Sequence, residues 1–159
     1  MNDLDEVSLH IDAAPEVVWE LVSDPTRMRL WSPSCRRCIW IGRTRGPVPG
    51  ARFLGVNRRG IVILPTLNRV ERVEYCREFA FRTTTHNTLW RYRLQPAGQG
   101  TLLTEQRDTS GTRAWMLRPL YTLLLGGYDN FHDELRAGML TTLQRIKAAA
   151  ESDANRCSR

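Results

Sequence analysis

Residues 128–150 read YDNFHDELRAGMLTTLQRIKAAA, and this stretch decides the fold class. Bulky apolar residues recur in it at steps of three or four, namely Tyr128, Phe131, Leu135, Met139, Leu143 and Ile146. That spacing places them on one face of an α-helix and leaves charged and amide side chains on the other. A helix of roughly 20 residues spans about 30 Å, so a large partner surface must cover its apolar stripe.

The chain upstream of this helix predicts that partner surface, a sheet. Val7 to Ile11 alternates as a half-buried strand, Pro15 and Glu16 open a short helix, and a second short helix covers residues 26–30. Six further strands are predicted between turn signals, at residues 35–42, 51–56, 61–73, 78–83, 89–94 and 101–107, with the third of them bent or interrupted at Pro65. Strands followed by a long helix indicate an α+β protein. We therefore predict a curved antiparallel sheet of six to seven strands wrapped around the C-terminal helix.

Length and composition indicate one ordinary globular domain. The chain has 159 residues, of which 42% are hydrophobic and 25% charged. We place the domain at residues 1–150 and expect a polar, disordered tail at residues 151–159. The N-terminus lacks the basic start and apolar run of a signal peptide, and no stretch is long enough for a transmembrane helix. We expect a cytoplasmic protein.

The net charge of +6 raises the question of nucleic-acid binding. The basic residues are nearly all arginines, with Lys147 the only lysine, and they are dispersed along the chain. No basic helix or aromatic-rich strand motif accompanies them, so we predict no specific nucleic-acid partner.

The motifs of common catalytic sites are missing. Cys35 and Cys38 match C-x-x-C without a second pair, so a zinc site lacks ligands, and the pair precedes a strand rather than a helix. There is no glycine-rich phosphate loop and no nucleophile elbow. Lys147 falls on the polar face of the last helix, which argues against Schiff-base chemistry. We predict no metal and no cofactor.

One long helix cannot fill the concave side of such a sheet, so the pattern predicts a cavity between them. The residues we expect to bind a ligand there are bulky and mostly aromatic: Trp31, Phe53, Phe79, Phe81, Trp90, Tyr92, Phe131, Leu135 and Met139. A filled core remains the alternative for any one of them.

Three polar residues are candidates for acid–base chemistry. Glu105 has the strand parity of Leu103, so it points either inward, with a raised pKa, or outward toward an arginine. Arg107 shares this parity and would pair with Glu105 or with a ligand carboxylate, and Tyr92 would supply a hydrogen bond. Asn57, Asn68 and His86 are further polar candidates.

The segment from Trp115 to Leu125 is apolar nearly all round and is interrupted by Pro119. Periodicity does not separate a packed helix from a lid over the cavity or a homodimer contact.

Several short stretches are similar to a known family: residues 11–19 (IDAAPEVVW), 22–25 (VSDP), 31–33 (WSP), 50–53 (GARF), 78–81 (EFAF), 90–94 (WRYRL), Gly100-Thr101, Thr104-Glu105 and the C-terminal helix. Together they resemble the START-related helix-grip superfamily, also called SRPBCC or birch-pollen-allergen-like, and within it bacterial polyketide cyclase/dehydrase-type proteins. The resemblance implies binding or transport of a small hydrophobic molecule such as a lipid, a polyketide or another aromatic metabolite. The alternative is a cyclase, aromatase or dehydratase that uses Glu105, Tyr92 or Arg107 without a cofactor.

Overall fold

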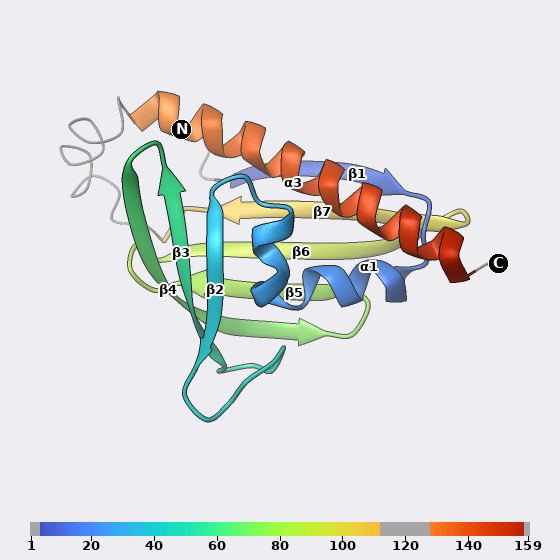
Figure 1. The fold of residues 1–159 in the computed structure, drawn as a ribbon, viewed down its shortest axis with the longest axis horizontal. Helices are drawn as coiled ribbons and strands as arrows, with labels where there is room; N and C mark the ends of the chain where they lie inside the picture. Colours follow the sequence, from blue (N-terminus) through green and yellow to red (C-terminus); the bar gives the residue numbers. More distant parts are fainter. Residues whose placement is uncertain (1–3, 112–127, 158–159) are drawn as a thin grey trace.

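The computed structural model describes residues 4–111 and 128–157, with side chains in the second range given from Asp133 to Arg156. Its sheet is seven-stranded and antiparallel, in the order β1-β7-β6-β5-β4-β3-β2 (Figure 1). The strands are β1 (Leu4–Ile11), β2 (Cys35–Ile41), β3 (Arg52–Arg59), β4 (Val62–Glu74), β5 (Glu78–Thr83), β6 (Thr88–Ala97) and β7 (Gly100–Asp108). Apart from the link from β1 to β7, each strand pairs with its neighbours in the chain, as expected for a meander.

Within the described residues, three helices cover one face of this sheet (Figure 1). The short helix α1 (Pro15–Val22) begins at a proline, and the 3-10 helix η1 (Pro25–Leu30) is capped by Asp24, whose Oδ1 accepts from Thr26 N at 2.9 Å. The long helix α3 (Tyr128–Cys157) crosses the concave side of the sheet. The predicted α+β helix-grip fold, with two short helices after the first strand, is confirmed.

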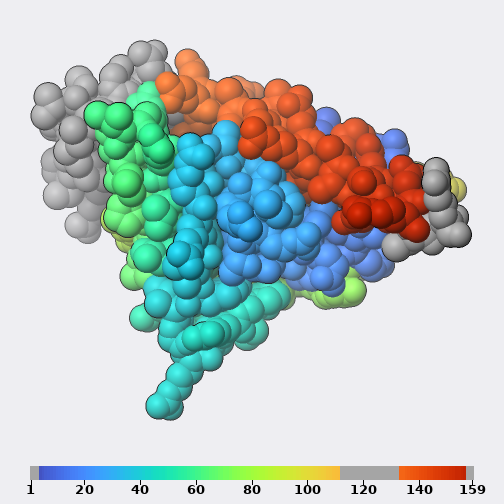
Figure 2. All heavy atoms as spheres, in the orientation of Figure 1, coloured from blue at the N-terminus to red at the C-terminus, as the bar shows by residue number. Residues whose placement is uncertain are grey.

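The core is most completely filled under the second half of α3. Leu143, Ile146 and Ala150 are fully buried, as are Ile11 of β1 and Val18 of α1. The space-filling view shows α3 lying closely against the β1 and α1 segments along this half (Figure 2). Any vacant space must therefore lie toward the other end of α3.

The structure differs from the sequence-based prediction in the C-terminal tail, and of the two alternatives at Pro65 it excludes the interruption of the strand. The predicted disordered tail is helical as far as the structure describes it, because α3 continues past Ala150 to Cys157. Ala154 still packs against the core, and Arg156 pairs with Asp153, so the last turns are held in place by contacts that a polar composition does not reveal. Pro65 does not interrupt β4, because it pairs in register with Val56 of β3. On the other side of β4 the paired part of β5 begins only opposite Asn68, so no strand there requires the N–H group that Pro65 lacks.

The region from Trp115 to Leu125 lies outside the described residues, so its predicted role as a lid, dimer contact or core is not addressed by the structure. In the part of the chain that is described, no helix is both long and apolar enough to span a membrane.

Candidate functional site

A cavity of about 670 Å³ lies between the concave face of the sheet and the first half of α3. Its wall is formed by strands β2 to β7, by the loop between η1 and β2, and by α3 from Glu134 to Thr142. Six wall residues are also exposed and mark where the cavity reaches the surface; we call Pro33, Arg58, Pro65, Thr85, Glu134 and Ala137 the rim. A volume of this size suits a small-molecule ligand.

Most of the predicted ligand-binding residues lie on this wall. Phe53, Phe81, Trp90 and Tyr92 contribute the aromatic side, and Leu135 and Met139 face them from α3. The rings of Phe53 and Phe81 meet edge to face with centroids 5.1 Å apart, and Trp40 extends the cluster on the far side of Phe53 at 5.6 Å. Such contacts fix ring orientation, so this side of the cavity is pre-formed rather than loosely packed.

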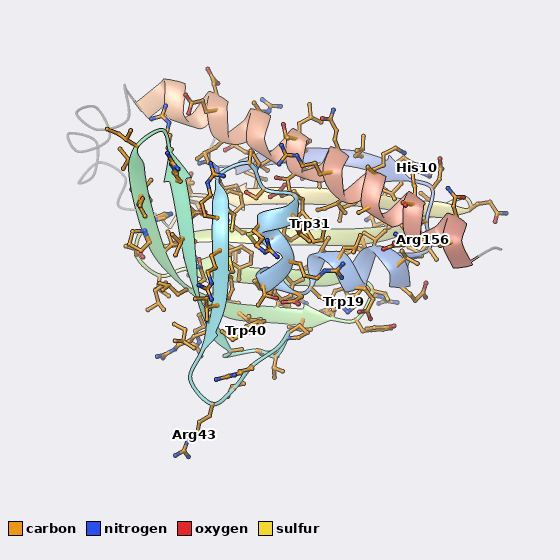
Figure 3. The ribbon with its side chains drawn as sticks, in the orientation of Figure 1. His10, Trp19, Trp31, Trp40, Arg43 and Arg156 are labelled. Carbon is orange, nitrogen blue, oxygen red and sulfur yellow. The ribbon has the colours of Figure 1, made fainter. Side chains whose placement is uncertain are left out.

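Two predicted residues do not line the cavity. Trp31 and Phe79 belong to the buried core, with 5% and 0% exposure. Trp31 closes η1, accepts a hydrogen bond from Arg145 Nη1 at its carbonyl, and carries the Arg27 guanidinium over its ring (labelled in Figure 3). Strand parity correctly predicts that Phe79 points toward the concave face of the sheet. The cavity, however, lies only under the first half of α3, and Phe79 belongs to the packed core instead. The side chain of Phe131 lies outside the described residues.

Glu105 points inward, beside Tyr92. The two residues are opposite one another in the β6–β7 register, and Tyr92 Oη donates to Glu105 Oε1 at 3.0 Å. Glu105 is only 3% exposed, and its second oxygen, Oε2, has no hydrogen-bond partner among the described residues. Burial raises the pKa of Glu105 to about 8, against the opposing effect of the Tyr92 hydrogen bond, and burial also raises the pKa of Tyr92 well above its usual value. The carboxyl is therefore mostly protonated at neutral pH.

Arg107 also lines the cavity, and its described ion-pair partner is Asp5, which the sequence analysis did not suggest. Its Nε donates to Asp5 Oδ2 at 2.9 Å, from the facing position on β1. The Arg107 side chain is 4% exposed, so this is a buried ion pair that holds the guanidinium at the wall. Nearby, the pKa of His86 is lowered by burial and by the charge of Arg107, which favours a neutral imidazole facing the cavity.

A polar strip crosses the wall between the aromatic rings and the rim. Thr83 Oγ1 donates to Asn68 Oδ1 at 2.8 Å, and Asn68 Nδ2 donates to the Thr66 carbonyl at 3.1 Å. Asn68 was a predicted polar candidate, as was Asn57, which also lines the cavity. The threonines were missed, although Thr66 has the strand parity of Asn68 and Thr83 that of Phe81. Their hydroxyls give the cavity hydrogen-bonding positions without a net charge.

Cys38 is another wall residue that sequence reasoning missed. In a regular strand, Cys35 and Cys38 would point to opposite faces, but β2 contains a register shift between Cys35 and Arg37. Both thiols are consequently buried on the same side, with their sulfur atoms 3.6 Å apart. The hydrogen bond that the Cys38 thiol shares with Cys35, together with burial, holds the pKa of Cys38 above its usual range. Among the described residues there is no group of three or more side chains able to hold a metal ion.

An ion pair joins the sheet to α3 at the rim. Arg59 Nε and Nη2 donate to the two carboxylate oxygens of Glu134 at 2.6 and 2.7 Å, and both residues line the cavity. The pairing raises the pKa of Arg59 and lowers that of Glu134. Since the Glu134 side chain is 58% exposed, this contact positions the start of α3 more than it stabilises the fold.

Comparison with known proteins agrees with this geometry. The profile of the family described as "Polyketide cyclase / dehydrase and lipid transport" matches residues 6–139. A search of curated proteins found no match.

Solved structures share the fold over nearly the whole chain. The di-domain ARO/CYC protein StfQ from the steffimycin biosynthetic pathway superposes with a TM-score of 0.75 at 15% identity; the match covers 96% of this chain but 52% of StfQ, so this chain spans about half its length. The Polyketide_cyc-like protein Cgl2372 from Corynebacterium glutamicum is 30% identical, with a TM-score of 0.58 and coverage of 92% of this chain and 88% of Cgl2372. Ara h 8.0201 matches with a TM-score of 0.64 at 10% identity, covering 94% of this chain and 97% of its own.

Proposed function

This chain belongs to the polyketide cyclase/dehydrase and lipid transport family, and we propose that it binds or carries a small, largely hydrophobic molecule in the cavity under α3. The observation that carries the proposal is the cavity of about 670 Å³ with an aromatic and aliphatic wall. Burial of a ligand against such a wall is favourable at roughly 25 cal/mol per Å² of apolar surface removed from water. A ligand of drug-like size gains most of its affinity in this way.

The polar groups of the wall narrow the ligand's chemistry. Asn68, Thr83 and the protonated Glu105 offer hydrogen bonds without a net charge, and the charge of Arg107 is compensated by Asp5. We therefore expect an uncharged ligand with a few carbonyl or hydroxyl groups on an apolar skeleton, such as a polyketide, another aromatic metabolite or a neutral lipid. A ligand with an ionised group deep in the cavity would bind weakly, because the charge would lose its hydration without gaining a partner of opposite charge.

The test is native mass spectrometry of the purified protein, followed by extraction and identification of any bound molecule. Leu135 faces the cavity, whereas Leu140 of the same helix is 42% exposed, so the two provide a matched pair of variants. We expect Leu135→Trp to narrow the cavity and reduce the amount of adduct, and Leu140→Trp to leave it unchanged. An adduct that Leu135→Trp leaves as abundant as Leu140→Trp does would place the ligand elsewhere and overturn the proposal.

A second candidate function is supported by the Glu105–Tyr92 pair. A buried, protonated carboxyl that lines a cavity, with one oxygen that has no partner among the described residues, is suited to general acid catalysis, for example protonation of an enolisable carbonyl during cyclisation or dehydration. The pKa of about 8 lies close to the range in which such a group gives and regains a proton at neutral pH. Turnover of a poly-β-keto substrate that is lost in Glu105→Gln, while binding of that substrate persists, would favour the enzyme over the carrier.

A further inference from the structure

The outer surface of β2, β3 and β4 exposes an unusual number of apolar side chains. Phe53, Gly55 and Asn57 face the cavity, so alternate residues of β3 and their register partners face outward. The apolar residues of this outer face are Ile39, Ile41, Leu54, Val56, Ile63, Pro65 and Leu67. We call it, together with its arginines described below, the β2–β4 outer face.

These apolar residues form a contiguous surface. Leu54 is opposite Ile39 on one side and Leu67 on the other, so three side chains make a row across the strands. Ile39 and Leu67 are each 39% exposed, and Ile63 is 64% exposed. At the β3–β4 turn Ile61 extends the surface with an exposure of 93%. A large exposed apolar patch on one sheet face indicates an interaction surface.

The charges on the β2–β4 outer face have a single sign. Arg37, Arg52, Arg58 and Arg69 lie among the apolar residues, and none of the residues that form this face is acidic. Within residues 4–111 and 133–156, Arg37, Arg52 and Arg69 make no ion pair.

The arginines of the neighbouring strands differ in this respect. Arg82 pairs with Glu71 at 2.7 Å, and Arg91 lies 3.2 Å from Glu78. The β2–β4 outer face therefore carries several arginines whose charge no described acidic side chain compensates. The loop that continues β2 projects from the body of the molecule (Figure 2) and carries a further arginine, Arg43, at its tip (Figure 3).

We propose that the β2–β4 outer face docks on a bilayer that contains anionic phospholipids. Uncompensated arginines attract the phosphate groups at such a surface, and exposed isoleucines between them gain free energy by entering the interface. The two features together do not suit the other partners. A second copy of the face would bring like charges together. A nucleic acid would bind the arginines through its phosphates but would leave the isoleucines without an apolar contact.

Docking of this face would bring the cavity close to the membrane. Ile61 and Ile63 flank the β3–β4 turn, whose strands also carry the cavity-lining residues Arg58, Arg59 and Leu64. The rim is thus adjacent to the end of the face with the most exposed isoleucines. This inference goes beyond ligand binding, because it assigns a surface that shares only Arg58 and Pro65 with the cavity lining.

The experiment is vesicle flotation with the full chain. One set of vesicles contains phosphatidylcholine alone, and the other contains phosphatidylglycerol at about 30 mol%. We expect binding only to the second set, weakening as salt is added. The triple variant Arg37→Gln/Arg52→Gln/Arg69→Gln should bind on the order of a hundredfold more weakly, since each basic residue near an anionic surface contributes about a factor of five.

A matched control separates the face from the overall charge. Arg29→Gln/Arg77→Gln/Arg136→Gln removes the same charge from exposed arginines outside the face, and none of the three forms an ion pair with a described residue. This control should keep most of the binding, whereas Ile61→Ser/Ile63→Ser should lose it without any change in charge.

Three results would overturn the proposal. Equal losses in the two arginine variants would show a general charge effect. Binding of a DNA oligonucleotide but not of vesicles would identify the partner as nucleic acid. Dimers in sedimentation that disappear in Ile61→Ser/Ile63→Ser would identify it as a second copy. All of these readouts are independent of the ligand adduct that tests the cavity.

Discussion

The replacement of Glu105 by glutamine tests how completely water is excluded from the carboxyl group of this residue. Burial raises the pKa of this carboxyl from 4.5 to about 8 in the folded protein. Below about pH 4.5 the group is protonated in both the folded and the unfolded chain, so no ionisation penalty opposes folding. As pH rises from 4.5 to about 8, the unfolded chain loses the proton while the folded chain keeps it. The free energy of unfolding of the wild type then falls by about 1.4 kcal/mol per pH unit, to a total of at most about 5 kcal/mol.

Glutamine cannot ionise, so the Glu105→Gln variant lacks this pH-dependent loss. Its stability relative to the wild type should therefore increase steadily between about pH 5 and pH 8 and level off above that. The assay is urea unfolding of both proteins at several pH values, with a carboxyl carbon NMR titration of Glu105 as a direct measure of the pKa. A constant difference in stability over this pH range would refute the reasoning, because it would mean that water or another group stabilises the ionised carboxylate.

The Glu134→Gln variant serves as a control of opposite sign. The pKa of Glu134 is lowered by its hydrogen bonds with Arg59, so its contribution to stability is present above pH 4.5 and is lost as pH falls through the lower folded value. Its difference from the wild type should therefore stay flat between about pH 5 and pH 8, where the Glu105→Gln difference changes most.

Two further predictions concern stability. Gly100→Ala should destabilise the protein by several kcal/mol, because a Cβ atom there would lie 2.2 Å from the carbonyl oxygen of Ile11. Gly138→Ala should instead stabilise α3 by up to about 1 kcal/mol, because its new Cβ would meet only Pro33 Cγ, at 3.5 Å. Thermal unfolding measures both changes. Arg107→Met should cost about 3 to 5 kcal/mol by leaving the carboxylate of Asp5 half-buried without its partner, and adding Asp5→Leu should recover much of that loss in a double-mutant cycle measured by denaturant unfolding.

The fold was predictable because its signals are local and redundant. The apolar stripe of residues 128–150 has helix spacing, and the strands upstream alternate between clear turn signals. The start of β1 was less predictable: only Val7 to Ile11 was expected, whereas the strand begins at Leu4. Asp5 and Glu6 hide the strand pattern, and the true partner of Arg107 was missed for that reason.

For the site, strand parity predicted only which face of the sheet each side chain points to. Parity correctly turned Glu105, Tyr92, Phe53 and Phe81 toward the concave side. It does not say how far along the sheet the cavity extends, which is why Phe79 was included although it lies in the filled core. It also fails at a bulge, so the common orientation of Cys35 and Cys38 could not be predicted from their spacing.

The central claim is that the space between the sheet and α3 holds a hydrophobic molecule, and the most direct test is a crystal structure of the protein purified without added ligand. We predict continuous electron density of a non-protein molecule in contact with Trp90, Tyr92 and Leu135. A cavity closed by interlocked side chains, or occupied by ordered water alone, would contradict the claim.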